Sequence, residues 1–146
     1  MLTGSLNWFE YPIIAQPHHT DYSGVVWHGT YLTWLEEARV EYLRSIGINY
    51  IDLVNLGCDL PVVDLAIRYH QPVFMGMKAV VKVSMQPFSG VRLNWDYRLE
   101  SPDSNILYLT AQVTLVVVDR NKGKIMRKLP PGVKEVLSKL VIVNSK

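Results

Sequence analysis

The chain has a single cysteine, Cys58, among its 146 residues. One cysteine excludes an intramolecular disulfide and a cysteine-based zinc site, and it favours a reducing, cytoplasmic location. No stretch approaches the about 20 consecutive apolar residues that a membrane-spanning helix needs, so we expect no membrane association. Residues 1–6 lack a basic start and a long apolar run, which argues against a signal peptide.

The chain also lacks a large excess of either charge, because its formal net charge is only +2. Proteins built to bind nucleic acid carry a strongly basic face, so we do not expect nucleic acid as a partner. One local basic run is present, formed by Lys122, Lys124, Arg127 and Lys128. Such a run is either a solvated surface or one that meets a phosphate group or a partner.

Five segments show the alternation of apolar and polar residues that is typical of strands. The first covers residues 8–16, where Pro12 indicates an edge strand or a bulge because proline cannot donate to a ladder. The other four cover residues 63–69, 78–86, 91–100 and 107–117. The connections at 87–90 and 101–105 are short enough for hairpins, which predicts an antiparallel sheet.

Three segments have helical spacing. Residues 31–46 predict a helix about 24 Å long, at about 1.5 Å per residue. This helix is apolar on more than one side, so most of its circumference should be covered. A second, short helix is predicted at 50–55, and Pro130-Pro131 opens a final helix over about 131–141.

The order of these elements predicts an α+β fold for residues 1–146 as a single domain. A single antiparallel sheet with one apolar face must bury that face, and the helix over 31–46 supplies the matching surface. We therefore expect a curved sheet that surrounds one central helix.

Histidines, an aspartate and a glycine are concentrated between the first strand and this helix. This connection contains His18, His19, Asp21, Gly24 and His28. Loops held between rigid elements often carry function. The amides after Gly24 run into the helix start, where free N–H groups can stabilise an oxyanion. A carboxylate beside them can attack a carbonyl or activate water. Together they would suffice to hydrolyse an activated acyl group such as a thioester.

The same segment carries a recognisable motif. It reads Asp21-x-x-Gly24, an apolar residue, Val26, Trp27, His28, two variable residues and Tyr31, followed by Glu36-x-Ala38-Arg39. This pattern resembles the 4-hydroxybenzoyl-CoA thioesterase family, and in particular the branch that includes the Tol–Pal-associated acyl-CoA thioesterases.

The resemblance implies a hotdog fold, in which a curved antiparallel sheet of five or six strands wraps round a long central helix. It implies hydrolysis of an acyl-CoA thioester to a free acid and CoA, without cofactor or metal. It also implies a homodimer or homotetramer with active sites at the subunit interface.

The resemblance further assigns roles to particular residues. Asp21 would be the nucleophile or general base, and the backbone N–H of His28 would be an oxyanion donor. The imidazole of His28 would line the acyl pocket or orient water. The remaining substrate-binding residues would be Gly24, Val26, Trp27 and Tyr31.

The turn at 87–92 departs from the family, because some members carry several basic residues there and this chain has only Arg92. The CoA phosphates could instead meet Lys78, Lys82 or Arg92. Alternatively, the acyl group is carried by the phosphopantetheine of an acyl carrier protein.

Simpler interpretations stay open for several of these residues. Asp21 alone would most often be a turn or cap residue, and His28 could be purely structural. Glu36 and Arg39 are three residues apart on the predicted helix, which suits a buried or interface ion pair, with Glu36 as a second carboxylate near the thioester as the alternative. The spacing of the histidines and Asp21 matches no compact zinc motif.

At the level of function, the alternative is a non-catalytic hotdog module that binds an acyl-CoA or an acyl carrier.

Overall fold

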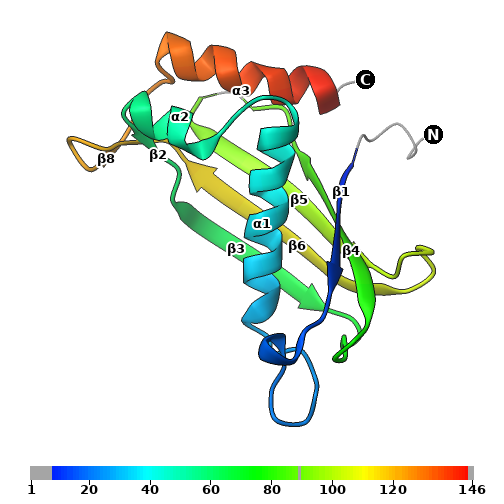
Figure 1. Cartoon of the computed structure of the whole chain (residues 1–146). Helices are drawn as coiled ribbons and strands as arrows, with labels where there is room; N and C mark the ends of the chain where they lie inside the picture. The colour runs from blue at the N-terminus through cyan, green and yellow to red at the C-terminus, as the bar shows by residue number, and fades with distance from the viewer. Residues whose placement is uncertain (1–7, 89, 145–146) are drawn as a thin grey trace.

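The computed structural model describes residues 8–88 and 90–144, with side chains described up to residue 139. The expectation for residues 1–6 lies outside this range. The elements, labelled in Figure 1, are β1 (Phe9–Ile14), the one-turn 3-10 helix η1 (Pro17–His19), α1 (Thr30–Ser45), α2 (Tyr50–Asn55), β2 (Cys58–Asp59), β3 (Val62–Tyr69), β4 (Lys78–Met85), β5 (Arg92–Glu100), β6 (Leu107–Val116), β7 (Val118–Asp119), β8 (Lys124–Ile125) and α3 (Pro131–Asn144).

Five strands form one antiparallel sheet in the order β1-β4-β5-β6-β3. The two predicted hairpins join β4 to β5 and β5 to β6. β3 pairs with β6 and not with β4, its nearest successor in the chain, so β3 and β1 become the two edges of the sheet. Pro12 therefore lies in an edge strand, as its missing N–H group predicts.

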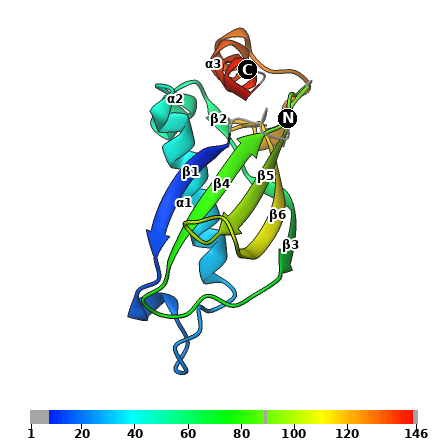
Figure 2. The ribbon, with the colours of Figure 1, turned by 90° about the vertical axis from the view of Figure 1, so that its right-hand side faces the viewer.

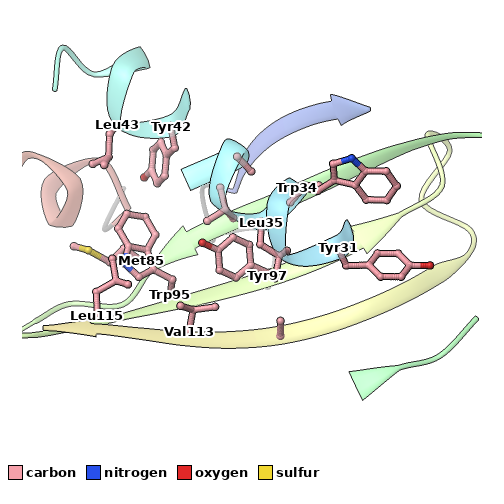
Figure 3. Packing of buried hydrophobic residues seen from close by; sticks show 14 of the residues in the cluster. Tyr31, Trp34, Leu35, Tyr42, Leu43, Met85, Trp95, Tyr97, Val113 and Leu115 are labelled. Carbon is pink, nitrogen blue, oxygen red and sulfur yellow. The ribbon is translucent and has the colours of Figure 1, made fainter. Parts of the chain in front are cut away.

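α1 crosses one face of this sheet, and α2 and α3 lie at the end where α1 stops (Figures 1 and 2). The buried face of α1 packs against large side chains that point from the sheet (Figure 3). Four of these aromatic side chains are buried: Trp34, Tyr42, Trp95 and Tyr97. The rings of Tyr42 and Trp95 pack edge to face. Burial of these rings holds α1 against the sheet.

One side of α1 remains open, so the expectation that most of its circumference is covered holds only in part. Leu32 and Glu36 are exposed on this side, next to the β3 edge. Arg39, on the same helix, is only 4% exposed. Its Nη1 donates to the Tyr97 hydroxyl at 2.9 Å, whereas its Nε has no hydrogen-bond partner among the described residues. The Arg39 guanidinium is thus buried at the edge of the open side of α1.

Three short strands form a second sheet in the order β2-β7-β8, at the end of the molecule where α2 and α3 lie. Strands of two residues carry no periodicity, so the sequence did not predict them. α3 extends to Asn144, three residues beyond the predicted end, and buries Val133 and Leu137. Among the described residues, no helix is long and apolar enough to span a bilayer.

The hydrogen bond between Arg39 and Tyr97 gives a test of the core. Tyr97→Phe should lower the free energy of unfolding by about 1–3 kcal/mol, because a buried cationic donor loses its acceptor. Urea unfolding measures this loss. Tyr108→Phe is the matched control, since Tyr108 is also buried but its hydroxyl has no hydrogen bond among the described residues. Equal losses in the two variants would contradict the assigned role of Tyr97.

Candidate active site

The connection between β1 and α1 forms a narrow turn at one end of the molecule, seen at the bottom of Figure 1. Thr20 and Val26 form an isolated antiparallel bridge, and the Asp21 N–H donates to the Val25 carbonyl at 2.8 Å. Gly24 closes the turn with φ +82°, a backbone conformation that favours glycine. Asp21 is therefore held on a short, internally bonded turn.

The Asp21 carboxylate uses one oxygen to fix this turn. Oδ1 accepts from the Ser23 hydroxyl at 2.8 Å, the Ser23 N–H at 2.9 Å and the Val25 N–H at 3.2 Å. Oδ2 has no partner among the described residues, and the side chain is exposed. The Ser23 hydroxyl and N–H hold the pKa of Asp21 below its ordinary value. Asp21 is thus a turn residue, as the simpler interpretation held, but it is also an ionised carboxylate with one free oxygen.

The start of α1 offers free backbone donors. The Trp27 N–H donates to the His19 carbonyl at 3.0 Å, and the Thr30 N–H donates to the Trp27 carbonyl at 2.9 Å. By contrast, the amides of His28 and Gly29 have no acceptor within the part of the chain that the structure describes. Free amides at a helix start are suited to bind a partial or full negative charge.

Two contacts fix the backbone that carries these amides. The Tyr69 hydroxyl, at the end of β3, donates to the His28 carbonyl at 3.0 Å. The Trp27 ring packs directly over Gly29, where an added Cβ would lie 2.0 Å from a ring carbon. Gly29 is therefore required by the close approach of the Trp27 ring.

A shallow cavity of about 280 Å³ lies beside His28, just before the start of α1. Val26, His28 and Tyr31 line it together with Tyr69 and His70. Of the predicted site residues, Asp21, Gly24 and Trp27 do not line this cavity. The structure thus gathers part of the predicted site around one cavity, while Asp21 lies on the neighbouring turn.

The structure does not bring the three predicted phosphate contacts together. Lys82 forms an ion pair with Glu100 at 3.0 Å. Lys78 begins β4 and Arg92 begins β5, so the antiparallel pairing of these strands puts Lys78 and Arg92 at opposite ends of the sheet.

Glu36 and Arg39 form no ion pair among the described residues, so the predicted pair is not present within one chain. In the described part of the chain, no group of three or more histidine, cysteine, aspartate or glutamate side chains could hold a metal ion. His19 instead accepts the Gln16 N–H at Nδ1.

The sequence reasoning missed Ser23 and Tyr69. The spacing of Ser23, two residues after an aspartate, is typical of a hydroxyl that bonds a turn carboxylate and could have been recognised. Tyr69 carries no local signal, because its contact with His28 joins residues that are far apart in the sequence.

Comparison with known proteins places the chain in a family. The model of the thioesterase-like superfamily matches residues 15–139, and the chain belongs to this superfamily. A Synechocystis protein, sll0410, is 59% identical over 91% of this chain and 80% of its own length. YneP of Bacillus subtilis is 31% identical over 72% of this chain and 75% of its own length. Their names give the activities as unproven, esterase for the first and acyl-CoA thioesterase for the second.

A solved structure shows the same fold. The DHNA-CoA thioesterase from Staphylococcus aureus superimposes with a TM-score of 0.82 at 29% identity, over 94% of this chain and 93% of the other. The five-stranded antiparallel sheet with α1 on one face is accordingly a hotdog thioesterase fold. These comparisons support a hydrolase of the thioesterase type, but they do not identify the 4-hydroxybenzoyl-CoA or Tol–Pal branch.

The pKa of Asp21 gives a test of the turn geometry. Ser23→Ala removes the hydroxyl that stabilises the charged carboxylate, so the pKa of Asp21 should rise toward its ordinary value. NMR titration of the Asp21 carboxyl carbon measures the shift. Ser138→Ala is the control, because that hydroxyl donates to the Lys134 carbonyl in α3. An unchanged or lower pKa of Asp21 in the Ser23 variant would contradict this geometry.

Proposed function

We propose that the chain hydrolyses an acyl-CoA thioester to a free acid and CoA. One observation carries this proposal: an ionised carboxylate with a free oxygen, on Asp21, and the free amides of His28 and Gly29 lie in the same short connection before α1. Membership in the thioesterase-like superfamily supports the reaction class. The name of YneP and that of the Staphylococcus aureus enzyme support a CoA thioester as the substrate.

In this mechanism the thioester oxygen accepts hydrogen bonds from the His28 and Gly29 amides. These donors stabilise the negative charge that develops on the oxygen when the carbonyl carbon is attacked. The attack takes one of two routes. Asp21 attacks directly and forms an anhydride that water then hydrolyses, or Asp21 accepts a proton from the water that attacks. In both routes the carbon–sulfur bond breaks and CoA leaves as a thiolate that takes up a proton.

The cavity beside the amides is suited to the first atoms of the acyl group. Val26 and Tyr31 supply apolar walls, and the exposed His28 imidazole can orient water at the rim. Trp27 holds Gly29 and the adjacent amides in place. Gly24 gives the Asp21 turn its shape, so its contribution to substrate binding is indirect.

We further propose that two copies form a homodimer through the β3 edge and that the active sites lie at this interface. Val62, Val63 and Leu65 are exposed on β3, and β3 contains no proline to block pairing. A long, apolar, unpaired edge strand is a site where another strand adds readily. Because a two-fold interface uses the same surface on both copies, β3 can pair with β3 of the second copy.

The groove between α1 and β3 supports this choice of interface. It has a volume of about 300 Å³ and is lined by Leu32, Leu35, Leu65, Glu36 and Arg39, among others. Glu36 is exposed in it and Arg39 is buried with an unpaired Nε, so opposite charges are available to pair across the two-fold axis. In this dimer the second copy covers the open side of α1, and α1 becomes a central helix that the sheet wraps round.

The catalytic role of Asp21 is tested by Asp21→Asn. Turnover should fall by roughly 10²–10⁴-fold, because an amide can neither attack nor accept the proton. Release of the CoA thiol, followed over a panel of acyl-CoA thioesters, measures this. Glu10→Gln, an exposed carboxylate on β1, is the control and should keep full activity. Near-full turnover in the Asp21 variant would contradict the proposed mechanism. Tight acyl-CoA binding without thiol release in the unmodified protein would favour the non-catalytic module.

The dimer is tested by Leu65→Lys. A lysine at the centre of β3 should convert the dimer to a monomer, because it adds charges to the buried core of a two-fold interface. Light scattering after size-exclusion chromatography measures the mass, and circular dichroism checks the fold. Ile14→Lys is the matched control: Ile14 is 48% exposed on the other edge, against 42% for Leu65. A Leu65 variant that stays dimeric would rule out the β3 interface.

A further inference from the structure

β3 ends beside the start of α1, where its last residue, Tyr69, reaches the backbone before the helix (Figure 1). The Tyr69 hydroxyl donates to the His28 carbonyl at 3.0 Å. The first turn of α1 leaves that carbonyl to Tyr69, because the Leu32 N–H donates to the Gly29 carbonyl at 3.2 Å. A side chain 41 residues away in the sequence therefore supplies a donor that the helix itself does not supply.

The Tyr69 side chain is held in a fixed position. Its backbone pairs with Leu109 of β6, and its ring packs edge to face against Tyr31, with the ring centroids 5.4 Å apart. Tyr31 is in turn buried, and its hydroxyl accepts the Val73 N–H at 3.3 Å. The sheet and the core thus set the direction from which the Tyr69 hydroxyl approaches His28.

The His28 carbonyl and the Gly29 N–H belong to one planar peptide group. A hydrogen bond to the carbonyl oxygen polarises this group, so its N–H becomes a stronger donor. The Gly29 N–H has no acceptor within the described part of the chain, and it is one of the two amides proposed to bind the thioester oxygen. Tyr69 and the thioester oxygen would therefore lie at opposite ends of the same peptide group.

The other proposed donor, the His28 N–H, has a different support. It shares a peptide group with the Trp27 carbonyl, which accepts the Thr30 N–H at 2.9 Å. That support comes from a backbone amide, which is a weaker acid than the phenol hydroxyl of a tyrosine. We infer that Tyr69 is a positioning residue for thioester hydrolysis, which acts through the His28–Gly29 peptide group and makes the Gly29 N–H the stronger oxyanion donor.

This role of Tyr69 rests on the proposed function. The thioester oxygen carries more negative charge in the transition state than in the bound substrate, so a stronger donor stabilises the transition state more. Removal of the Tyr69 hydroxyl should therefore lower kcat and leave KM nearly unchanged. A hydroxyl that only shaped the cavity would act on substrate binding and thus on KM.

The first experiment measures this split. Tyr69→Phe should lower kcat for an acyl-CoA by about three- to tenfold, because the peptide group loses one hydrogen bond, and should change KM by less than about twofold. Tyr11→Phe is the matched control, because the Tyr11 hydroxyl donates to Glu37 of α1 at 3.3 Å from β1, the other edge of the sheet. The control should keep the original kcat and KM. Unchanged kcat in the Tyr69 variant, a loss confined to KM, or an equal loss of kcat in the Tyr11 variant would overturn the inference.

The second experiment separates donor strength from cavity shape with two CoA derivatives. One carries a trifluoromethyl ketone joined to the CoA sulfur through a methylene group, and its hydrated form has a tetrahedral centre with oxygens like the attacked thioester. The other carries an S-propyl group, which has no oxygen at that position. Tyr69→Phe should weaken binding of the ketone by about three- to tenfold and leave the Kd of the thioether unchanged, as measured by isothermal titration calorimetry. Binding of the thioether also reports that the variant is folded. Equal weakening of both ligands, or of neither, would overturn the inference.

The proposed function and the role of Tyr69 fail in different ways. If Asp21→Asn keeps near-full turnover, the catalytic assignment fails, whatever the Tyr69 variant does. If Asp21→Asn removes most turnover while Tyr69→Phe keeps the original kcat, only the role of Tyr69 fails.

Discussion

The packing of α1 against the five-stranded sheet is the constraint on which the rest of this structure depends. Buried rings such as Trp34 and Tyr42 hold the helix on the sheet. The Tyr69 hydroxyl then ties the His28 carbonyl to the end of β3. In the proposed mechanism, the amides of His28 and Gly29, held in this way, would meet a developing negative charge without reorganisation.

The same packing leaves one edge of the sheet and one side of α1 uncovered in the single chain. β3 is an edge strand with exposed apolar side chains, and Arg39 is buried at the margin of the groove beside it. A buried cation without a carboxylate partner is costly unless another group compensates it. In the proposed dimer, a second copy of the chain would cover the open face of α1, pair the free edge and compensate the charge near it.

Much of the fold could be predicted from the sequence, because period-two and helical patterns are strong in the five long strands and in α1. α1 begins at Thr30 and ends at Ser45, within one residue of the predicted bounds at both ends. Two features escaped prediction for a physical reason. The position of β3 beside β6 depends on pairing between distant residues, and the two-residue strands β2, β7 and β8 are held by neighbouring elements and not by their own periodicity.

The candidate site was predictable in part. The motif from Asp21 to Tyr31 gave the connection, and the structure shows free amides and a cavity there. The spacing of Asp21 and Ser23 could have indicated that the turn uses the Asp21 carboxylate. The further bond from the Val25 N–H could not be foreseen, because it depends on the backbone conformation that Gly24 permits. The roles of Lys78, Lys82 and Arg92 could not be judged before their strands were placed in the sheet.

The packing of Trp27 over Gly29 has a spectroscopic consequence. Trp27 is 54% exposed, whereas Trp34 and Trp95 are almost fully buried, so a water-soluble quencher such as iodide reaches the Trp27 indole far more readily than those two. The Trp27 indole also lies directly against the backbone that would receive a thioester oxygen. Its emission is therefore an intrinsic optical reporter of whether that position is occupied, and it needs no added label.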